Sequence, residues 1–135
     1  MKDVVEAWGR ADIGPIFAAL DDNVVWKSAS TGGEGRFRFG GEYRGRQSVV
    51  ALLSKISTAY FFSRYETKEV VSKGDVVWGL FVSHGTYSPV GERKPAVPFV
   101  LEQAMRWRIR DGKIVEAQTF FDTAGLLAQQ QAAAA

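Results

Sequence analysis

The last third of the chain contains a strand-turn-strand pattern that constrains the fold more than any other feature. Residues 98–110 and 113–121 are two strand-like runs, and Asp111-Gly112 separates them. An Asp-Gly pair between two such runs is typical of a tight turn that joins antiparallel strands. In the first run the odd positions are mainly apolar and the even positions include three arginines. We therefore expect the odd positions to lie on the covered face of a sheet.

The rest of the chain is expected to place helices before this sheet and to add strands to it. Apolar residues recur at spacings of three and four in two pieces within residues 1–20 and again over 47–62, which predicts three helices. Asp12 is placed to cap the second helix, because its carboxylate can accept hydrogen bonds from the first backbone amides. Further strands are expected at 24–28, 65–72 and 76–87. This order of elements predicts an α+β fold.

A single domain is expected over residues 1–135. Six glycines between Gly32 and Gly45 indicate a loop or an irregular hairpin rather than a domain boundary. Within this stretch, the segment Arg36-Phe37-Arg38-Phe39 has the composition of a surface that stacks on single-stranded nucleic acid, but a flap over a pocket fits the near-neutral overall charge better. The Gln- and Ala-rich tail at about 128–135 can extend a terminal helix or form a frayed end.

The composition excludes several kinds of site. The chain has no cysteine and one histidine, so disulfides, thiolate chemistry and a His-rich metal site are ruled out, and no metal is expected. A net charge of +2 is too small to indicate a nucleic-acid partner. The glycines form neither a phosphate loop nor a dinucleotide fingerprint, so no cofactor is expected. No segment reaches the roughly eighteen apolar residues of a membrane span, and we expect a soluble, cytoplasmic protein without a membrane partner.

Four segments that span nearly the whole chain carry a family resemblance: residues 6–12, 20–26, 43–45 and 111–122. Together they resemble the SnoaL-like branch of the nuclear transport factor 2-like (ketosteroid isomerase-like) superfamily. The resemblance implies a cystatin-like cone, in which a curved, mainly antiparallel (mixed) sheet and about three covering helices surround a central cavity. The superfamily includes polyketide cyclases, ketosteroid isomerases, limonene-epoxide hydrolases and non-enzymatic binding or oligomerisation domains.

Two catalytic sets of this superfamily are not matched in the chain. Where ketosteroid isomerases carry a general-base Asp after the first strand, this chain has Lys27 and Ser28. Their second acid would fall near Gln103 or Met105, and of these Gln103 can still donate a hydrogen bond. Where the epoxide hydrolases carry an Asp on the last strand, this chain has Thr119.

Asp122 resembles the C-terminal Asp of SnoaL-type polyketide cyclases, which is thought to act as acid and base on the substrate. The resemblance implies the same catalytic role here. A carboxylate beside Phe120 and Phe121 would lose hydration if it faced inward, which suits proton transfer. An Asp before Thr123 at the start of a terminal helix is also a capping arrangement. Both interpretations of Asp122 stay open.

His84 is the second catalytic candidate, because histidine gains and loses a proton near neutral pH. It lies in the middle of an expected strand whose two faces are both largely apolar, so alternation does not show which face lines the cavity. If both side chains point into one space, His84 and Asp122 are the minimum machinery for enolisation or ring closure. The alternative is a hydrogen-bonded structural histidine.

Large side chains in the expected strands and third helix are predicted to wall the pocket, with core packing as the alternative. The predicted lining residues are Trp26, Tyr60, Phe99, Gln103, Met105, Trp107 and Phe120.

Two classes of function follow from these expectations. The first is a cofactor-independent isomerase or cyclase that transfers protons on a small hydrophobic, carbonyl-bearing molecule. The second is a non-catalytic domain that binds a ligand or forms a homodimer. In that case Arg106, Arg108 and Arg110 on the exposed sheet face would meet a second copy of the chain.

Overall fold

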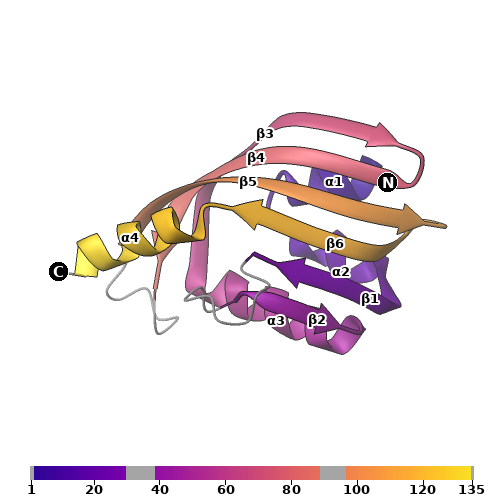
Figure 1. Ribbon diagram of the computed structural model, residues 1–135, viewed down its shortest axis with the longest axis horizontal. Helices are drawn as coiled ribbons and strands as arrows, with labels where there is room; N and C mark the ends of the chain where they lie inside the picture. The colour runs from indigo at the N-terminus through magenta and orange to yellow at the C-terminus, as the bar shows by residue number, and fades with distance from the viewer. Residues whose placement is uncertain (1, 30–38, 89–96, 135) are drawn as a thin grey trace.

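The computed structural model describes residues 2–29, 39–88 and 97–134, and the side chains of 4–29, 39–88 and 97–130 among them. Within these ranges the elements follow the order seen in Figure 1. They are α1 (Lys2–Trp8), α2 (Ile13–Ala19), β1 (Leu20–Ser28), β2 (Gly41–Arg44), α3 (Arg46–Ala59), β3 (Tyr60–Lys73), β4 (Val76–Tyr87), β5 (Val97–Arg110), β6 (Lys113–Phe121) and α4 (Thr123–Ala134). No helix in these ranges is long and apolar enough to cross a membrane.

The strands form a six-stranded, curved and unclosed sheet with the order β2-β1-β6-β5-β4-β3. Neighbouring strands are antiparallel except β1 and β6, which are parallel. Helices α1, α2 and α3 lie together on one face of the sheet, while α4 follows β6 and lies beside the first part of β5 (Figure 1). The α+β fold expected from the sequence, with its mixed curved sheet under helices, is confirmed.

The hydrophobic core lies between the sheet and its three covering helices. On β5 the odd positions from Phe99 to Ile109 point into this layer, as the alternation predicts, and Trp107 and Met105 are fully buried. Trp8 of α1 packs against Trp26 and Trp107, with ring centroids 5.7 and 6.0 Å apart. Burying such large apolar side chains stabilises the fold by roughly 1.5–3 kcal/mol each.

The boundary between α3 and β3 differs from the expected one. The helix predicted to reach residue 62 ends at Ala59, and Tyr60 has extended dihedral angles (φ −113°, ψ 125°). The run Tyr60-Phe61-Phe62 joins β3 instead and pairs with the far end of β4. Aromatic residues favour strands when a partner strand is available, so the tertiary pairing overrides the helical spacing.

The glycine-rich stretch contains a strand that the sequence pattern did not separate from loop. β2 pairs with β1 at the edge of the sheet, and Tyr43 lies opposite Trp26. Phe39, just before it, is buried in the core. Residues 30–38, with most of the expected flap, and residues 89–96, with most of the turn expected at 88–91, lie outside the described residues.

Helix α4 lies beside the first residues of β5, where β5 has no β6 partner. Because β6 ends at Phe121, the β6 ladder does not reach Val100. The side-chain amide of Gln129 takes the place of a strand there: its Oε1 accepts from Val100 N (2.8 Å) and its Nε2 donates to Val100 O (3.0 Å). The helix includes the tail after residue 128, up to Ala134.

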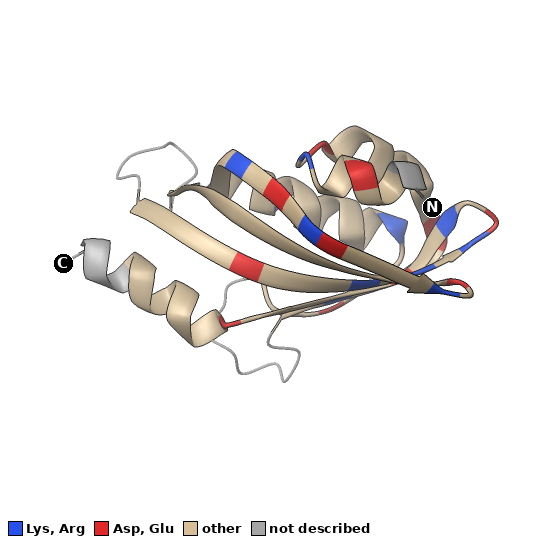
Figure 2. Cartoon of the chain, turned by 90° about the horizontal axis from the view of Figure 1, so that it is seen from above, with Lys and Arg blue, Asp and Glu red and all other residues tan. Residues whose placement is uncertain are grey.

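Charged side chains line β3, the edge strand at the other side of the sheet from β2. Along β3, Glu66 forms ion pairs with Arg64 and Lys68. Figure 2 shows these alternating charges as a blue and red band along one strand. Charged side chains on an edge strand discourage pairing with the edge of another sheet.

Candidate functional site

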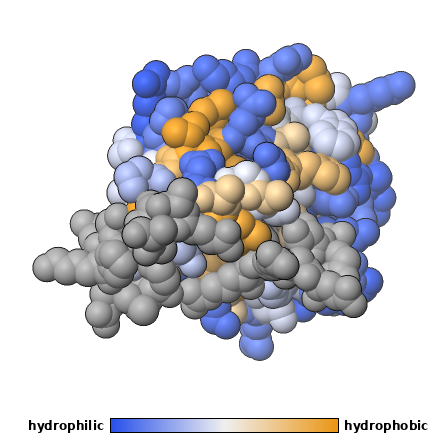
Figure 3. Space-filling view, turned by 60° about the vertical axis from the view of Figure 1, so that its left-hand side comes forward, coloured by the Kyte–Doolittle hydropathy of each residue, from blue (hydrophilic) through white to orange (hydrophobic). Residues whose placement is uncertain are grey.

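A cavity of about 450 Å³ lies between the covering helices and the inner face of the sheet. Its walls come from α1, the α1–α2 turn, α2, α3, α4 and every strand except β2. Eight of the lining side chains are aromatic: Trp8, Trp26, Tyr60, Phe61, Phe62, Tyr65, Phe99 and Phe121. Hydrophobic atoms also reach the surface at the end of the molecule turned forward in Figure 3. A space of this size, lined mainly by apolar groups, suits a small hydrophobic molecule.

A polar pair projects from the sheet into this apolar space. Gln103 Nε2 donates a hydrogen bond to the Tyr65 hydroxyl over 2.7 Å, and both residues line the cavity. Burial raises the pKa of Tyr65 well above its usual range, although the hydrogen bond from Gln103 acts in the opposite direction. Tyr65 therefore stays protonated at neutral pH and can donate its own O–H. Whichever way the Gln103 amide is turned, the pair keeps an N–H or O–H to offer a ligand.

Two further polar atoms in the cavity wall are buried and have no hydrogen-bond partner among the residues that the structure describes. They are Ser83 Oγ and Trp8 Nε1. Ser83 lies opposite Tyr65 in the β3–β4 pairing, so the two side chains are neighbours on one face. The indole N–H of Trp8 is close enough to Tyr65 to oppose the rise of its pKa, without the geometry of a hydrogen bond. A buried hydroxyl left unsatisfied costs about 1–3 kcal/mol, a cost that a bound polar group would remove.

The α1–α2 turn supplies the charged part of the lining, from Arg10 and Asp12. Arg10 Nη2 lies 3.8 Å from Asp12 Oδ2, and the two side chains are 61% and 50% exposed. Asp12 occupies the N-cap position of α2, as the sequence predicts, but the expected capping hydrogen bond from its side chain is not made. Among the residues that the structure describes, no three His, Cys, Asp or Glu side chains gather as metal ligands.

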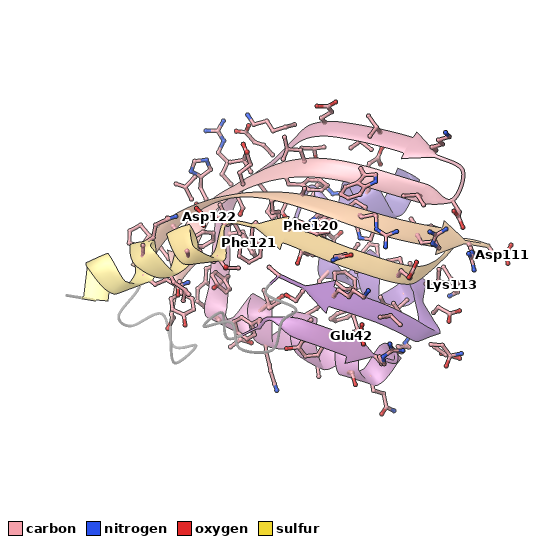
Figure 4. All side chains as sticks on the ribbon, in the orientation of Figure 1. Glu42, Asp111, Lys113, Phe120, Phe121 and Asp122 are labelled. Carbon is pink, nitrogen blue, oxygen red and sulfur yellow. The ribbon has the colours of Figure 1, made fainter. Side chains whose placement is uncertain are left out.

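Asp122, the catalytic residue predicted first, does not line the cavity. Its side chain is exposed, and its Oδ1 accepts a hydrogen bond from Gly125 N at 2.9 Å. Figure 4 shows Asp122 at the junction of β6 and α4. The geometry is that of the helix cap, the second of the two interpretations.

His84, the second predicted catalytic residue, lies on the face of β4 that points away from the cavity. Val77, Phe81 and Ser83 form the inward set on this strand, and His84 has the opposite parity. His84 is absent from the lining residues, as Asp122 is. The structure thus does not bring the two side chains into one space, which was the condition for their shared chemistry.

The predicted pocket walls divide into two groups. Trp26, Tyr60, Phe99 and Gln103 line the cavity. Met105 and Trp107 do not line it and are packed in the hydrophobic core, and Phe120 does not, because it lies on the outer face with 44% of its surface exposed. Phe120 points outward because side chains alternate along β6, and its neighbours Thr119 and Phe121 line the cavity.

Most of the described cavity residues that were not predicted are apolar, but they include the polar side chains of Tyr65, Ser83 and Asp12. Tyr65 and Ser83 lie in strands that were predicted, but with both faces of β4 apolar no periodic signal separated the inner from the outer set. Asp12 was noticed as a cap and not as a lining residue. A weak signal existed in Ser83, a small polar residue on the strand face that also carries Val77 and Phe81.

Comparisons with known proteins agree with this architecture. The family model of the SnoaL-like domain matches residues 1–117. Among solved structures, an NTF2-like protein from Burkholderia thailandensis is 25% identical, with a TM-score of 0.75 over 96% of this chain and 92% of that one. A protein proposed to be an isomerase, from Rhodopseudomonas palustris, is 17% identical, with a TM-score of 0.75 over 97% and 92% of the two chains.

A third similar structure, of a protein proposed to be a SnoaL-like polyketide cyclase from Mesorhizobium loti, is 16% identical, with a TM-score of 0.70 over 88% of this chain and 93% of that one. At such identities these structural likenesses show the fold alone. No match was found among curated proteins. On the family match, which covers most of its length, the chain belongs to the SnoaL-like domain family and has the fold of the NTF2-like proteins.

Proposed function

We propose that this chain is a SnoaL-like pocket protein that binds a small apolar, carbonyl-bearing molecule and transfers a proton on it as a cofactor-independent isomerase or cyclase. The observation that carries the proposal is the Tyr65–Gln103 pair, which offers hydrogen-bond donors inside an otherwise apolar cavity. The family includes polyketide cyclases and isomerases, which is consistent with this reaction class.

The donors suit a carbonyl oxygen rather than an anion. With its pKa raised by burial, Tyr65 remains a neutral donor. A carboxylate or phosphate would lose its hydration in this aromatic space and find Arg10 alone as a cation among the described lining residues. A ketone oxygen loses less hydration, and its partial charge grows when a neighbouring C–H bond ionises. Donors that are already in place then stabilise the developing enolate.

A matched pair of probes tests the binding step. 2-Acetonaphthone and 2-ethylnaphthalene have nearly the same shape, and the ketone alone accepts a hydrogen bond. We expect Tyr65→Phe to weaken binding of the ketone about two- to tenfold, since a hydrogen bond contributes roughly 0.5–1.5 kcal/mol, and to leave binding of the hydrocarbon unchanged. Fluorescence titration measures both dissociation constants.

Tyr43→Phe is the control for this experiment, because the Tyr43 hydroxyl donates to Gly40 O and lies outside the cavity lining. Equal losses for both probes in Tyr65→Phe would show that the hydroxyl only shapes the cavity. Failure of the wild-type protein to bind either probe would contradict the proposal as a whole.

A homodimer through the outer face of the sheet is a second proposal, and it is compatible with the first. The observation that favours it is an exposed aromatic stack: Trp78 and Phe120 lie 5.9 Å apart with an interplanar angle of 23°, and they are 40% and 44% exposed. Val71 and Val100 add exposed apolar surface from β3 and β5. Contiguous apolar surface of this kind marks interaction sites in soluble domains.

A further inference from the structure

The proposed reaction needs a group that accepts a proton at the cavity, and few lining side chains qualify. Among the described lining residues, the titratable side chains are Arg10, Asp12, Tyr60 and Tyr65. An arginine stays protonated in proteins, and a tyrosine is a donor near neutral pH. Burial moves Tyr65 further from ionisation by raising its pKa. Among the described lining residues, this leaves the carboxyl group of Asp12 as the candidate acceptor of a proton from a ligand.

The turn that carries Asp12 has a defined backbone. Ala11 has a φ of +55°, a left-handed conformation that a residue with a Cβ rarely adopts. The turn is held by hydrogen bonds from Ala11 N to Trp8 O (3.0 Å) and from Asp12 N to Ala7 O (2.8 Å). Strained backbone that surrounding contacts hold in place is found preferentially at functional sites. Arg10, Ala11 and Asp12 of this turn are all among the residues that line the cavity.

The Asp12 side chain is also free of the structural task that its position predicts. Although it is the N-cap residue of α2, it makes no capping hydrogen bond. The contrast with Asp122 is direct, because Asp122 Oδ1 is occupied by Gly125 N at 2.9 Å. A second sign of a ligand site on the same cavity is the buried Ser83 hydroxyl, which is 2% exposed and has no partner.

From these observations we infer that Asp12 is the general base of this site, in place of Asp122 and His84. The inference rests on the proposed function, since it assumes a carbonyl compound in the cavity. The Asp12 carboxylate forms an O–H bond to the α-hydrogen of the ketone as the C–H bond breaks. The C–H electron pair becomes the C=C bond of an enolate, and the carbonyl π pair moves to the oxygen, which accepts hydrogen bonds from the Tyr65–Gln103 pair.

The protonated Asp12 then returns its proton to a carbon of the enolate, so the step needs no oxidant or co-reactant. If the enolate is conjugated with a further double bond, return of the proton to a different carbon completes an isomerisation. Because the Asp12 side chain is 50% exposed, its carboxyl proton exchanges with solvent before it is returned. In D₂O the reaction therefore leaves deuterium at the α-carbon, even in a ketone that cannot isomerise.

The test uses 2-tetralone, an apolar bicyclic ketone, and follows loss of its α-proton signal in D₂O by NMR. We expect the wild-type protein to accelerate this exchange above the buffer rate in a saturable manner. Asp12→Asn should lower the protein's contribution at least about 100-fold, the usual scale of general base catalysis. Its dissociation constant for 2-tetralone should stay within about twofold, and Asp12→Glu should recover part of the rate.

Asp22→Asn is the matched control, because it makes the same change at an exposed aspartate outside the cavity lining. Asparagine is as good an N-cap residue as aspartate, so the melting temperature of Asp12→Asn should match that of the wild type. Exchange that persists in Asp12→Asn and is lost in Asp122→Asn would overturn the inference and leave the proposed function standing. A wild-type protein that binds 2-tetralone without exchange would overturn the inference together with the catalytic half of the proposal.

Discussion

At the residue scale, Asp12 and Asp122 show that two aspartates placed before helices can have different roles. Each precedes a helix, and the sequence predicts a cap for both and catalysis for Asp122. The structure gives the capping hydrogen bond to Asp122 and leaves the Asp12 side chain at the cavity. Sequence alone could not separate them, since the outcome depends on side-chain orientation at two turns.

A cap role for Asp122 predicts a specific loss of stability. Asp122→Ala removes the acceptor of the Gly125 amide and should lower the free energy of unfolding by about 1 kcal/mol. Asp122→Ser keeps a capping oxygen and should lose much less. Urea denaturation followed by circular dichroism measures both values, and an alanine variant as stable as the wild type would show that the cap contributes nothing.

The candidate site was predictable in part at this scale. Four of the predicted walls, including Trp26 and Gln103, line the cavity, because strand alternation is reliable where one face is polar. It failed to place His84, because the outer face of β4 carries Trp78, Leu80 and Val82 and looks as apolar as the inner one. When both faces of a strand are apolar, the sequence does not show which residues point inward.

At the scale of elements, the tip of the β3–β4 hairpin is tied to β5 by charge. Asp75 accepts from Arg108 Nη1 (2.9 Å) and from Arg110 Nε (3.0 Å), and Arg108 Nε also donates to Glu116 (2.8 Å). The hydrogen bond from Arg110, with that from Arg108 and the charge of both, lowers the pKa of Asp75 despite some desolvation. The turn between β3 and β4 is thus fastened to a neighbouring strand by its ionised carboxylate.

The lowered pKa gives this cluster a pH dependence of known sign. Because the folded-state pKa lies below the unfolded value of about 3.9, the stabilisation is fully present above that value and is lost as the pH falls through the folded pKa. We therefore expect Asp75→Asn to lower the melting temperature at pH 7 and to reduce its fall between about pH 5 and pH 2. Melting curves across this range, with Asp111→Asn at the exposed β5–β6 turn as control, measure the difference. Parallel pH profiles for Asp75→Asn and wild type would contradict it.

The elements themselves were largely predictable, although several bounds differ. β1 begins at Leu20 rather than at residue 24, so the second helix ends one residue earlier than expected, and β3 begins at Tyr60 rather than at residue 65. β4 and β6 have the predicted bounds, because turn residues mark both ends of each. The end of α3 was placed too late, since the Tyr60-Phe61-Phe62 run fits either a helix face or a strand until its partner on β4 is known. The short β2 was not predicted, because it lies in a glycine-rich stretch whose sequence has no strand pattern. It is recognised as a strand only by its pairing with β1.

At the scale of the whole molecule, the homodimer that we propose would form through the outer face of the sheet. The arginine row first expected to drive dimerisation is partly neutralised within the chain, since Arg108 and Arg110 are paired with Asp75 and Glu116. The exposed Trp78–Phe120 stack is the better candidate for the contact.

The proposed homodimer has a direct test in solution. We expect light scattering after gel filtration to give twice the chain mass for the wild type. Trp78→Asp should weaken dimerisation by at least about 30-fold, because a buried aromatic anchor at an interface contributes 2 kcal/mol or more. Ser54→Asp, an exposed position on α3 on the other side of the sheet, is the control. A monomeric wild-type protein at high concentration would rule the dimer out.

The proposed function requires that the cavity between helices and sheet is the place where the ligand is held. Intermolecular NOEs between the ring protons of bound 2-acetonaphthone and the methyl groups of the protein measure this most directly. The structure predicts NOEs to the lining residues Ile16, Leu53 and Leu126 and none to Val71 or Val100 on the outer face. NOEs confined to the outer-face valines would contradict the account.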